Sequence, residues 1–463
     1  MGYQPNSQYQ QFASKIPISE NDLLEYYKAG CKKPEEVKIG MEVEKHGIRR
    51  NNLQPVTYLD PNGFQNIQKK LIEELNWVAE REEGAYITSM SRGESRLTLE
   101  YCEDVCELSG RTHTSIHDLA RELRIHQHEL SEMSQIFDVV WFGMGYQPFK
   151  SDPVKHRRTP LNRFNILEDF FRRKSKLWTE TWHKLCSIQA NIDYTSEEDA
   201  RRKCHILLRL APFIGAMYAH SPLKDGVNTG FVSYRTHILR KLDRRRFGIR
   251  KIFFSKNFGF KEWIDFCKKV PMVTIFRDEK WIPIKNTTFA GFMKNGYGGF
   301  RPTLDDWILH VSFIYTDIRI KQYMELRVCD SLPPFLIPSL QAVVKAFVYH
   351  PDGERLITQL TKDWSFMDFC MIGEDIAKNG MFAALRGKKL LDYCKQILEI
   401  ATSNLQSFKI LNEKNEDESI YLKPIKEFVF VHEKSPGRWV MEKWEGEWRK
   451  NPEKLIEWCS FEG

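Results

Sequence analysis

The sequence has no apolar run of the roughly 18 residues that a membrane-spanning helix needs, so we expect no membrane partner. Residues 1–12 are polar and lack the apolar stretch of a secretory leader. Ten cysteines are present, yet Cys102 and Cys106 are followed by no second pair at the spacing of a zinc site. Together these absences predict reduced cysteines and a cytoplasmic location.

The motifs of several common catalytic and nucleotide-binding sites are also missing. The chain contains neither the G-x-x-x-x-G-K-S/T phosphate loop nor a G-x-G-x-x-G after a strand. It has no H-E-x-x-H metal motif and no G-x-S-x-G nucleophile elbow. The glycine cluster at 296–299 follows none of these patterns and indicates a turn. A nucleotide site in this chain would therefore depend on metal-binding carboxylates and basic side chains.

Charges of the two signs are nearly balanced. Lys and Arg number 69 and Asp and Glu 62, which gives a formal net charge of +7 and is only weak evidence for a nucleic-acid partner. With 42% apolar and 28% charged residues, the composition is that of a soluble globular protein, and 463 residues suffice for a sizeable core. We expect no nucleic-acid partner and leave the oligomeric state open.

Apolar and polar residues alternate in several short segments, which is the period of β-strands with one polar face. Strands are predicted at residues 37–48, 85–89, 95–108, 139–146, 186–194 and 319–327, with short strands and turns over 250–300. Helices are predicted at residues 20–29, 64–80, 113–136, 163–173, 199–220, 304–313, 339–349 and 387–405, and in a tail at 436–459. This interleaving predicts one α+β domain built on a mainly antiparallel sheet.

Two glutamates in the first predicted strand are the first candidates for a functional site. Glu42 and Glu44 stand two residues apart, so their side chains share one face. Neighbouring carboxylates repel each other when buried, and a hard divalent ion such as Mg²⁺ relieves that repulsion. A solvated strand face explains the same spacing and, on spacing alone, is the more frequent case.

Charged residues recur in two further predicted strands. Glu100 and Glu107 lie in an acidic segment of the strand at 95–108. One face of the predicted strand at 319–327 carries Arg319, Lys321, Glu325 and Arg327. Three cations and one carboxylate suit a surface that meets both polyphosphate and metal. An exposed strand with salt bridges accounts for this pattern equally well.

A basic stretch and two amides complete the candidates. Arg235 and Arg246 belong to a segment dense in arginine, a side chain that grips carboxylates with two hydrogen bonds. A solvated loop or a nucleic-acid patch is the alternative, although the stretch has few of the aromatic residues that single-strand binding uses. Gln189 and Asn191 share one face of a predicted strand, where buried amides more often stabilise structure than bind substrate.

Six segments along the chain are informative through their order and spacing. They are Ile39-Gly-Met-Glu-Val-Glu-Lys-His-Gly47, Phe142-Gly-Met-Gly-Tyr-Gln-Pro148, Ser187 to Ser196, Ser221-Pro222 with Asn228-Thr-Gly-Phe231, Asp305 to His310, and Arg319 to Asp330. Their order and spacing resemble the glutamate–cysteine ligase family, most closely its plant-type branch. The resemblance runs from about residue 37 to about residue 390 and is weaker in the tail.

This resemblance implies a fold related to glutamine synthetase, in which a curved antiparallel sheet flanked by helices lines a funnel-shaped active site. It implies one ligase domain over residues 1–463, with an N-terminal extension at 1–36, a catalytic core at 37–405 and a helical tail at 406–463. It also implies a reaction: ATP phosphorylates the side-chain carboxylate of glutamate, and the amine of cysteine displaces phosphate, feeding glutathione synthesis.

The resemblance assigns roles to the candidate residues. The implied magnesium ligands are Glu42, Glu44, Glu100, Glu107 and Glu325. The implied substrate-binding residues are Arg235, Arg246, Gln189 and Asn191. The residues expected to neutralise ATP phosphates are Arg319, Lys321 and Arg327. Catalytic roles fall to Glu42, Glu44, Glu325 and Arg246, with Mg²⁺ and ATP as the groups bound.

The chain departs from the family pattern at two places. The segment 101–106 replaces a Pro-Gly-Gly-Gln stretch of the plant-type branch and lengthens the interval between Glu100 and Glu107 by one residue, as in the proteobacterial branch. Val328 and Cys329 replace small residues after the last strand. Three activities remain open: coupling of glutamate to cysteine, coupling of glutamate to another amine, and a catalytically silent relative that binds a nucleotide or a partner.

Overall fold

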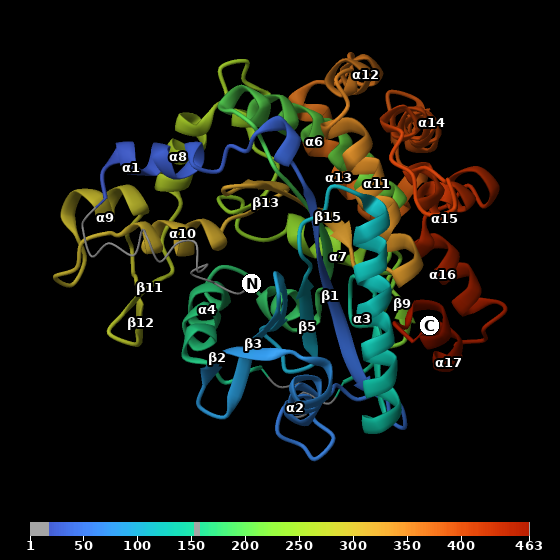
Figure 1. The fold of residues 1–463 in the computed structure, drawn as a ribbon, viewed down its shortest axis with the longest axis horizontal. Helices are drawn as coiled ribbons and strands as arrows, with labels where there is room; N and C mark the ends of the chain where they lie inside the picture. Colours follow the sequence, from blue (N-terminus) through green and yellow to red (C-terminus); the bar gives the residue numbers. More distant parts are fainter. Residues whose placement is uncertain (1–17, 152–157, 463) are drawn as a thin grey trace.

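A nine-stranded sheet lies at the centre of the computed structural model, which describes residues 18–151 and 158–462 (Figure 1). The strands of its main path follow the order β14-β15-β7-β1-β5-β4-β3-β2, β6 pairs with β1, and all pairs are antiparallel. The strands are β1 (Ile39–Arg49), β2 (Val78–Glu83), β3 (Tyr86–Arg92), β4 (Ser95–Leu99), β5 (Val105–Ser109), β6 (Val139–Phe142), β7 (Ser187–Ile192), β14 (Ile318–Ile320) and β15 (Met324–Asp330). This arrangement confirms the α+β prediction.

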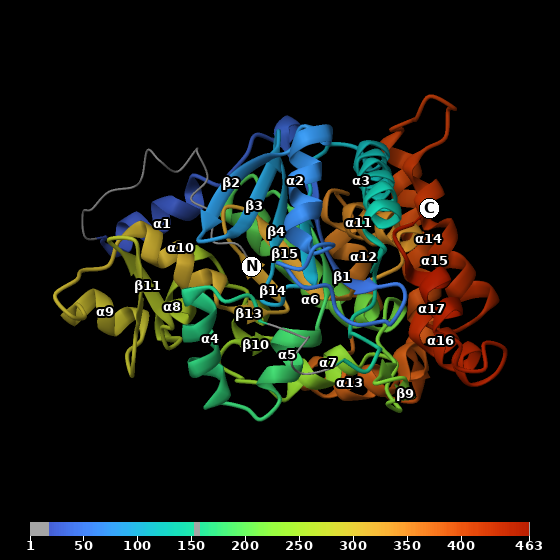
Figure 2. The ribbon, with the colours of Figure 1, turned by 90° about the horizontal axis from the view of Figure 1, so that it is seen from below.

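Helices surround the sheet. They are α1 (Glu20–Lys28), α2 (Phe64–Leu75), α3 (Ile116–Phe137), α4 (Asn162–Arg172), α5 (Trp178–Lys184), α6 (Glu197–Met217), α7 (Tyr234–Arg240), α8 (Phe260–Lys269), α9 (Phe289–Asn295), α10 (Leu304–Ser312), α11 (Ile337–Val348), α12 (Gly353–Leu360), α13 (Phe366–Asn379), α14 (Leu390–Phe408), α15 (Lys423–Lys426), α16 (Pro436–Glu445) and α17 (Pro452–Cys459). Figures 1 and 2 both place α1 and α8–α10 at one side of the molecule and α14–α17 at the other. None of the described helices is long and apolar enough to cross a membrane.

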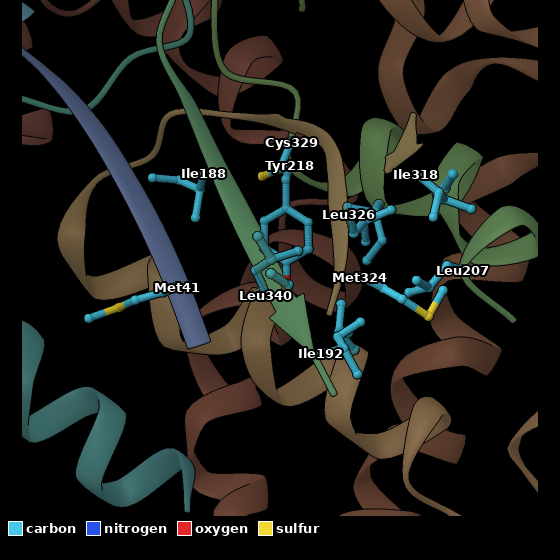
Figure 3. Packing of buried hydrophobic residues seen from close by; sticks show 14 of the residues in the cluster. Met41, Ile188, Ile192, Leu207, Tyr218, Ile318, Met324, Leu326, Cys329 and Leu340 are labelled. Atoms are coloured by element: carbon cyan, nitrogen blue, oxygen red, sulfur yellow. The ribbon is translucent and has the colours of Figure 1, made fainter. Parts of the chain in front are cut away.

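The apolar face of the sheet packs on α6 and α11. Side chains at alternate positions of three strands point to this face, as the two-residue period requires. They include Met41 in β1, Ile188 and Ile192 in β7, and Met324 and Leu326 in β15 (Figure 3). Leu207 of α6 and Leu340 of α11 lie against them. The intervening residues of the same strands, which include the candidate charged residues, therefore point to the opposite face.

Short two-stranded ribbons lie outside the main sheet. They pair β8 (Leu223–Lys224) with β9 (Val227–Asn228), β10 (Phe247–Gly248) with β13 (Tyr315–Thr316), β11 (Thr274–Arg277) with β12 (Lys280–Pro283), and β16 (Ala384–Leu385) with β17 (Lys388–Lys389). The β10–β13 pair is parallel, and it places Phe247 and Gly248 beside Tyr315 and Thr316, shortly before β14 begins.

Two segments predicted as single strands are each two strands. Residues 95–108 fold as β4, a turn and β5, and residues 319–327 span the hairpin of β14 and β15. Alternation continues through both turns, so the two-residue period does not mark where the chain reverses. Both predictions were wrong in topology, although the residues they singled out lie in strands or at strand ends.

Several other elements differ from the prediction, among them helices α5, α7 and α12, which were not predicted. The helix expected at 64–80 ends at Leu75, because Asn76 adopts a left-handed conformation with φ 57° and the chain then enters β2. Helix α8 lies where short strands were expected, and it buries Phe260, Trp263, Ile264 and Cys267 at helical spacing. Helix α13 was not predicted. The division of the chain into extension, core and tail stays a prediction, while one buried apolar cluster includes residues from Leu23 to Phe461.

A buried ion pair attaches the segment after α14 to the rest of the fold. Glu418 Oε1 accepts hydrogen bonds from Lys345 Nζ at 2.7 Å and from the Ile116 amide at 2.6 Å. Both charged side chains are nearly inaccessible to solvent. The contact therefore joins α11, the start of α3 and the 418–422 turn.

We expect Glu418→Gln to lower the free energy of unfolding by roughly 3 kcal/mol, because removing one partner leaves the other charge buried and unpaired. Lys395→Met is the matched control: it removes an ion pair with Glu433 that is exposed to solvent, and its expected cost is below about 1 kcal/mol. Urea unfolding of both variants measures the two values. Equal effects would show that the Lys345–Glu418 pair contributes no more than a surface contact.

Candidate functional site

A row of carboxylates crosses two neighbouring strands on the polar face of the sheet. Glu42 and Glu44 lie two positions apart in β1, and Glu44 stands directly opposite Glu107 of β5. Directly opposite residues of an antiparallel pair point to the same face. Glu100 follows the end of β4, two positions after Thr98, which pairs with Glu107. The sheet register thus brings four of the five predicted metal ligands together.

Glu42, Glu44 and Glu107 each accept a hydrogen bond from a residue of the neighbouring strands or of their own strand. Asn191 Nδ2 donates to Glu42 Oε1 at 3.0 Å, and the Ser187 amide and hydroxyl donate to Glu44 Oε2 at 2.6 and 3.0 Å. Ser109 Oγ donates to Glu107 Oε1 at 2.7 Å, whereas the buried Oε2 of Glu107 has no hydrogen-bond partner among the residues that the structure describes. An unpaired buried carboxylate oxygen is costly and is a position for a ligand.

The carboxylates of the row destabilise one another's charged forms. Burial, reinforced by the charges of Glu42 and Glu100, raises the pKa of Glu107 to about 8. Burial and the charge of Glu100 also raise the pKa of Glu44. A cation at this position would relieve both effects.

The row fits magnesium through the chemistry of its oxygen donors. Among the described residues, no three His, Cys, Asp or Glu side chains lie close enough together to hold one ion. Mg²⁺ is commonly bound by one or two carboxylates together with water and substrate phosphate, so it requires no such protein cage. The unpaired Glu107 oxygen and the raised pKa values of Glu44 and Glu107 fit a site of this open kind.

The fifth predicted ligand, Glu325, lies in a cluster of cations. It pairs with Arg319 across the β14–β15 hairpin and forms ion pairs with Arg319, with Lys321 at 2.6 Å and with Arg327 at 3.2 Å. Burial alone would raise the pKa of Glu325, but the three cations outweigh it and hold the pKa well below its usual range. Its carboxylate is thus already neutralised, and its role as a metal ligand stays a prediction.

The amides of β7 lie between the carboxylate row and the cation cluster. Gln189 stands opposite Glu42 and accepts a hydrogen bond from Arg327 through Oε1. Asn191 stands opposite Glu325 on one side and donates to Glu42 on the other. The predicted nucleotide-binding and metal-binding residues are therefore neighbours across β15, β7, β1 and β5.

A cavity of about 470 Å³ opens beside this face. Of the predicted site residues, those that line it are Glu44, Glu100, Arg235 and Arg327. Its volume falls within the range of small-molecule sites. Val328, one of the departures from the family pattern, also lines it, so the bulkier side chain contributes to the shape of the cavity.

The two predicted substrate arginines have different surroundings. Arg235 of α7 lines the cavity, donates to the carbonyls of Arg327 and Val328, and lies 3.7 Å from Asp330. Arg246 does not line it: its guanidinium is fully buried, donates to the carbonyls of Phe313 and Pro271, and lies over the ring of Phe170 at 4.8 Å. Arg246 thus anchors two backbone segments away from the cavity, and its role in substrate binding stays a prediction.

Sequence reasoning missed Arg163 of α4. This arginine is 7% exposed, contacts the Phe164 ring at 4.5 Å, and has no hydrogen bond or ion pair with a described residue. Burial lowers its pKa to about 10. It lines a small cavity that shares Glu100 and Tyr101 with the main one. A buried guanidinium without an acceptor is suited to an anionic ligand.

Several of the sequence motifs meet at Asp330. This buried carboxylate accepts hydrogen bonds from the His220 amide at 2.8 Å and from the hydroxyls of Ser221 and Ser233 at 2.8 and 3.0 Å. A Cβ at Gly145 would lie 2.6 Å from the Asp330 carboxyl carbon, so glycine is required there. These motifs hold the end of β15 and the start of α7 in place, and with them Arg235.

Comparison with known proteins gives consistent results. A model of glutamate–cysteine ligase family 2 matches residues 38–457. The chloroplastic glutamate–cysteine ligase of Medicago truncatula is 28% identical over 450 residues, covering 95% of this chain and 85% of that protein. The chloroplastic glutamate–cysteine ligase A of Oryza sativa subsp. indica is 28% identical over 396 residues, covering 84% and 79%.

A solved structure shares the fold. The glutamate–cysteine ligase of Francisella tularensis in complex with AMP superposes with a TM-score of 0.52 at 13% identity, covering 91% of this chain and 86% of that one. The expected cytoplasmic location requires correction, because the plant relatives are chloroplastic proteins by name. Since the family model spans nearly the whole described chain, this protein belongs to glutamate–cysteine ligase family 2, a family of ligases that join glutamate and cysteine.

Proposed function

We propose that this protein uses Mg-ATP to join the side-chain carboxylate of glutamate to the amine of cysteine through a γ-glutamyl phosphate. One observation supports this proposal above the others. An acidic row, in which one Glu107 oxygen has no hydrogen-bond partner among the described residues, lies on adjacent strands beside the cations around Glu325 and against a cavity of about 470 Å³. Phosphoryl transfer depends on such positioning and charge neutralisation more than on a dedicated base.

The proposed reaction has two chemical steps, phosphorylation of glutamate and transfer of its acyl group to the amine. A side-chain oxygen of glutamate attacks the γ-phosphorus of ATP, and ADP leaves with the electrons of the broken P–O bond. The amine nitrogen then attacks the acyl carbon, phosphate leaves with the electrons of the C–O bond, and a proton is released. Both steps concentrate negative charge on phosphate oxygens, which cations must offset.

We assign magnesium to the acidic row of Glu42, Glu44, Glu100 and Glu107, in which each ion would be held by one or two of the carboxylates together with water and substrate phosphate. When bound, Mg²⁺ would neutralise phosphate oxygens and orient the γ-phosphate. The surrounding donors keep these carboxylates in place: Asn191 fixes Glu42, and Ser187 fixes Glu44 with two hydrogen bonds. Glu325 remains a candidate fifth ligand.

Cationic side chains are assigned to the anionic parts of the substrates. Lys321 and Arg327 are the candidates to receive ATP phosphates, with Arg319 holding Glu325 behind them. Arg235 and Arg163 are the candidates to bind the carboxylates of glutamate, because both lie at the cavities next to Glu100. Nucleotide binding is in keeping with the AMP complex of the Francisella tularensis ligase.

The activity is tested by measuring ADP release from Mg-ATP in the presence of glutamate. We expect a marked rise on adding cysteine, and formation of γ-glutamyl hydroxamate when hydroxylamine replaces the amine, because hydroxylamine traps an acyl phosphate. If another amine supports turnover and cysteine does not, that amine is the acceptor and the assignment of cysteine is wrong. If the protein forms no hydroxamate and releases no ADP, it is a catalytically silent relative and the proposal is refuted.

A further inference from the structure

The cavity has a second charged wall, which the proposed chemistry does not use. Arg240, Arg244 and Arg250 line it together with Asp317. Arg240 closes α7, Arg250 follows β10, and Asp317 lies between β13 and β14. The parallel pairing of β10 with β13 brings these segments together, and the Asp317 amide donates to the Gly248 carbonyl at 3.3 Å.

None of these arginines is neutralised by a described carboxylate. The guanidinium of Arg240 donates to the Cys370 carbonyl and that of Arg250 to the Phe247 carbonyl. Arg244 is exposed and forms no hydrogen bond or ion pair with a described residue. Asp317 feels the charges of Arg240, Arg250 and Arg235 but makes no ion pair with any of them. The wall therefore has surplus positive charge that faces the cavity.

The wall begins next to the reacting groups. The Arg327 amide donates to the Asp317 carbonyl at 3.0 Å, and Arg235 lies on the same helix as Arg240. Arg327, Asp317 and the three arginines all line this one cavity, so a single ligand in it has access to Arg327 and to the wall. Apolar side chains, including Leu239 and Leu242, line the same cavity and leave room for a small aliphatic group.

Resting on the proposed function, we propose that this wall binds the acceptor amine and selects an amino acid with a free carboxylate over a simple amine. Arg240 and Arg244 bind the carboxylate, with Arg250 adding positive charge, and Asp317 receives the ammonium group before reaction. The presence of Asp317 favours an amino acid over a triphosphate, because a carboxylate repels phosphate and attracts ammonium.

The test uses two acceptor pairs that differ only in the carboxylate: cysteine with cysteamine, and 2-aminobutyrate with propylamine. Hydroxylamine is the internal reference, because it is small, uncharged and lacks a carboxylate. Each acceptor is titrated at saturating Mg-ATP and glutamate with the wild type, Arg240→Gln and Arg244→Gln. Arg245→Gln is the matched control, since Arg245 is exposed, pairs with Asp243 and does not line the cavity.

The wild type should prefer the carboxylate-bearing member of each pair in kcat/KM. Both cavity variants should lower the ratio of cysteine to hydroxylamine in kcat/KM by roughly tenfold or more, the effect of losing one charge-assisted hydrogen bond. Arg245→Gln should behave as the wild type. Equal losses for cysteine and cysteamine, or a selective rise in KM for ATP or glutamate, would overturn the assignment. Absence of hydroxamate in the wild type would instead refute the proposed function.

Discussion

Glu44→Gln is expected to lower kcat/KM for glutamate-dependent ADP release by a factor on the order of 10²–10³. Glutamine keeps the shape of the side chain and can still accept from Ser187, whose amide and hydroxyl bond to Glu44 in the wild type. It lacks the negative charge that a magnesium ligand needs. The loss should therefore appear in turnover and not in folding, and steady-state kinetics with a thermal unfolding curve measure both.

Glu82→Gln serves as the control for this substitution. Glu82 is exposed on the edge strand β2, in the same sheet but away from the cavity, so its replacement should leave kcat/KM within a factor of about two. Unchanged activity in Glu44→Gln would remove Glu44 from the metal site. Lost activity together with a collapsed unfolding transition would instead indicate a structural role.

Regular strands allowed the Glu42 and Glu44 pair of the acidic row to be predicted from the residues alone, whereas Glu100 and Glu107 were assigned to it through the family resemblance. The period of two placed Glu42 with Glu44 and Gln189 with Asn191, and the structure keeps both pairs on one face. The two-residue period does not reveal which strands pair with each other, or in which register. That Glu44 faces Glu107 depends on the register of β1 with β5, which is set by packing and turns distant in sequence.

The cation cluster was predicted correctly in composition for a wrong reason. Arg319 and Glu325 do not share a face of one strand; they are cross-strand partners of a hairpin that reverses at residues 321–323. Cross-strand partners and residues two apart both meet on one face, so the error in topology left the cluster intact.

Single arginines on helices and loops cannot be assigned to a site from a strand period. Arg163 stands out only because it is buried with no acceptor among the described residues, and only the structure shows that the guanidinium of Arg246 donates to backbone carbonyls. Both properties arise from tertiary packing, and neither has a period or a spacing that sequence alone displays. For the same reason Arg240 and Arg250 were not singled out from sequence, and Arg244 was noted only as part of a dense basic stretch.

In the metal-free protein, Glu107→Gln is expected to become more stable than the wild type as pH rises. Burial and neighbouring carboxylates raise the pKa of Glu107 to about 8 in the folded state, against an ordinary value of 4.5 when unfolded. Between these values the folded state holds a proton that the unfolded state releases, so wild-type stability falls as pH rises and levels off above about pH 8. The variant escapes this loss, which is on the order of a few kcal/mol.

Urea unfolding with a chelator at pH 5, 6.5 and 8 measures this difference in the free energy of unfolding. Burial lowers the pKa values of His126, His220 and His310, which makes stability rise with pH below about 6.5, but these histidines contribute equally to both proteins. Adding Mg²⁺ with ATP at pH 8 should stabilise the wild type more than the variant, because the ion offsets the repulsion that the glutamine has already removed. A stability difference that does not change with pH would show that Glu107 is not held among like charges.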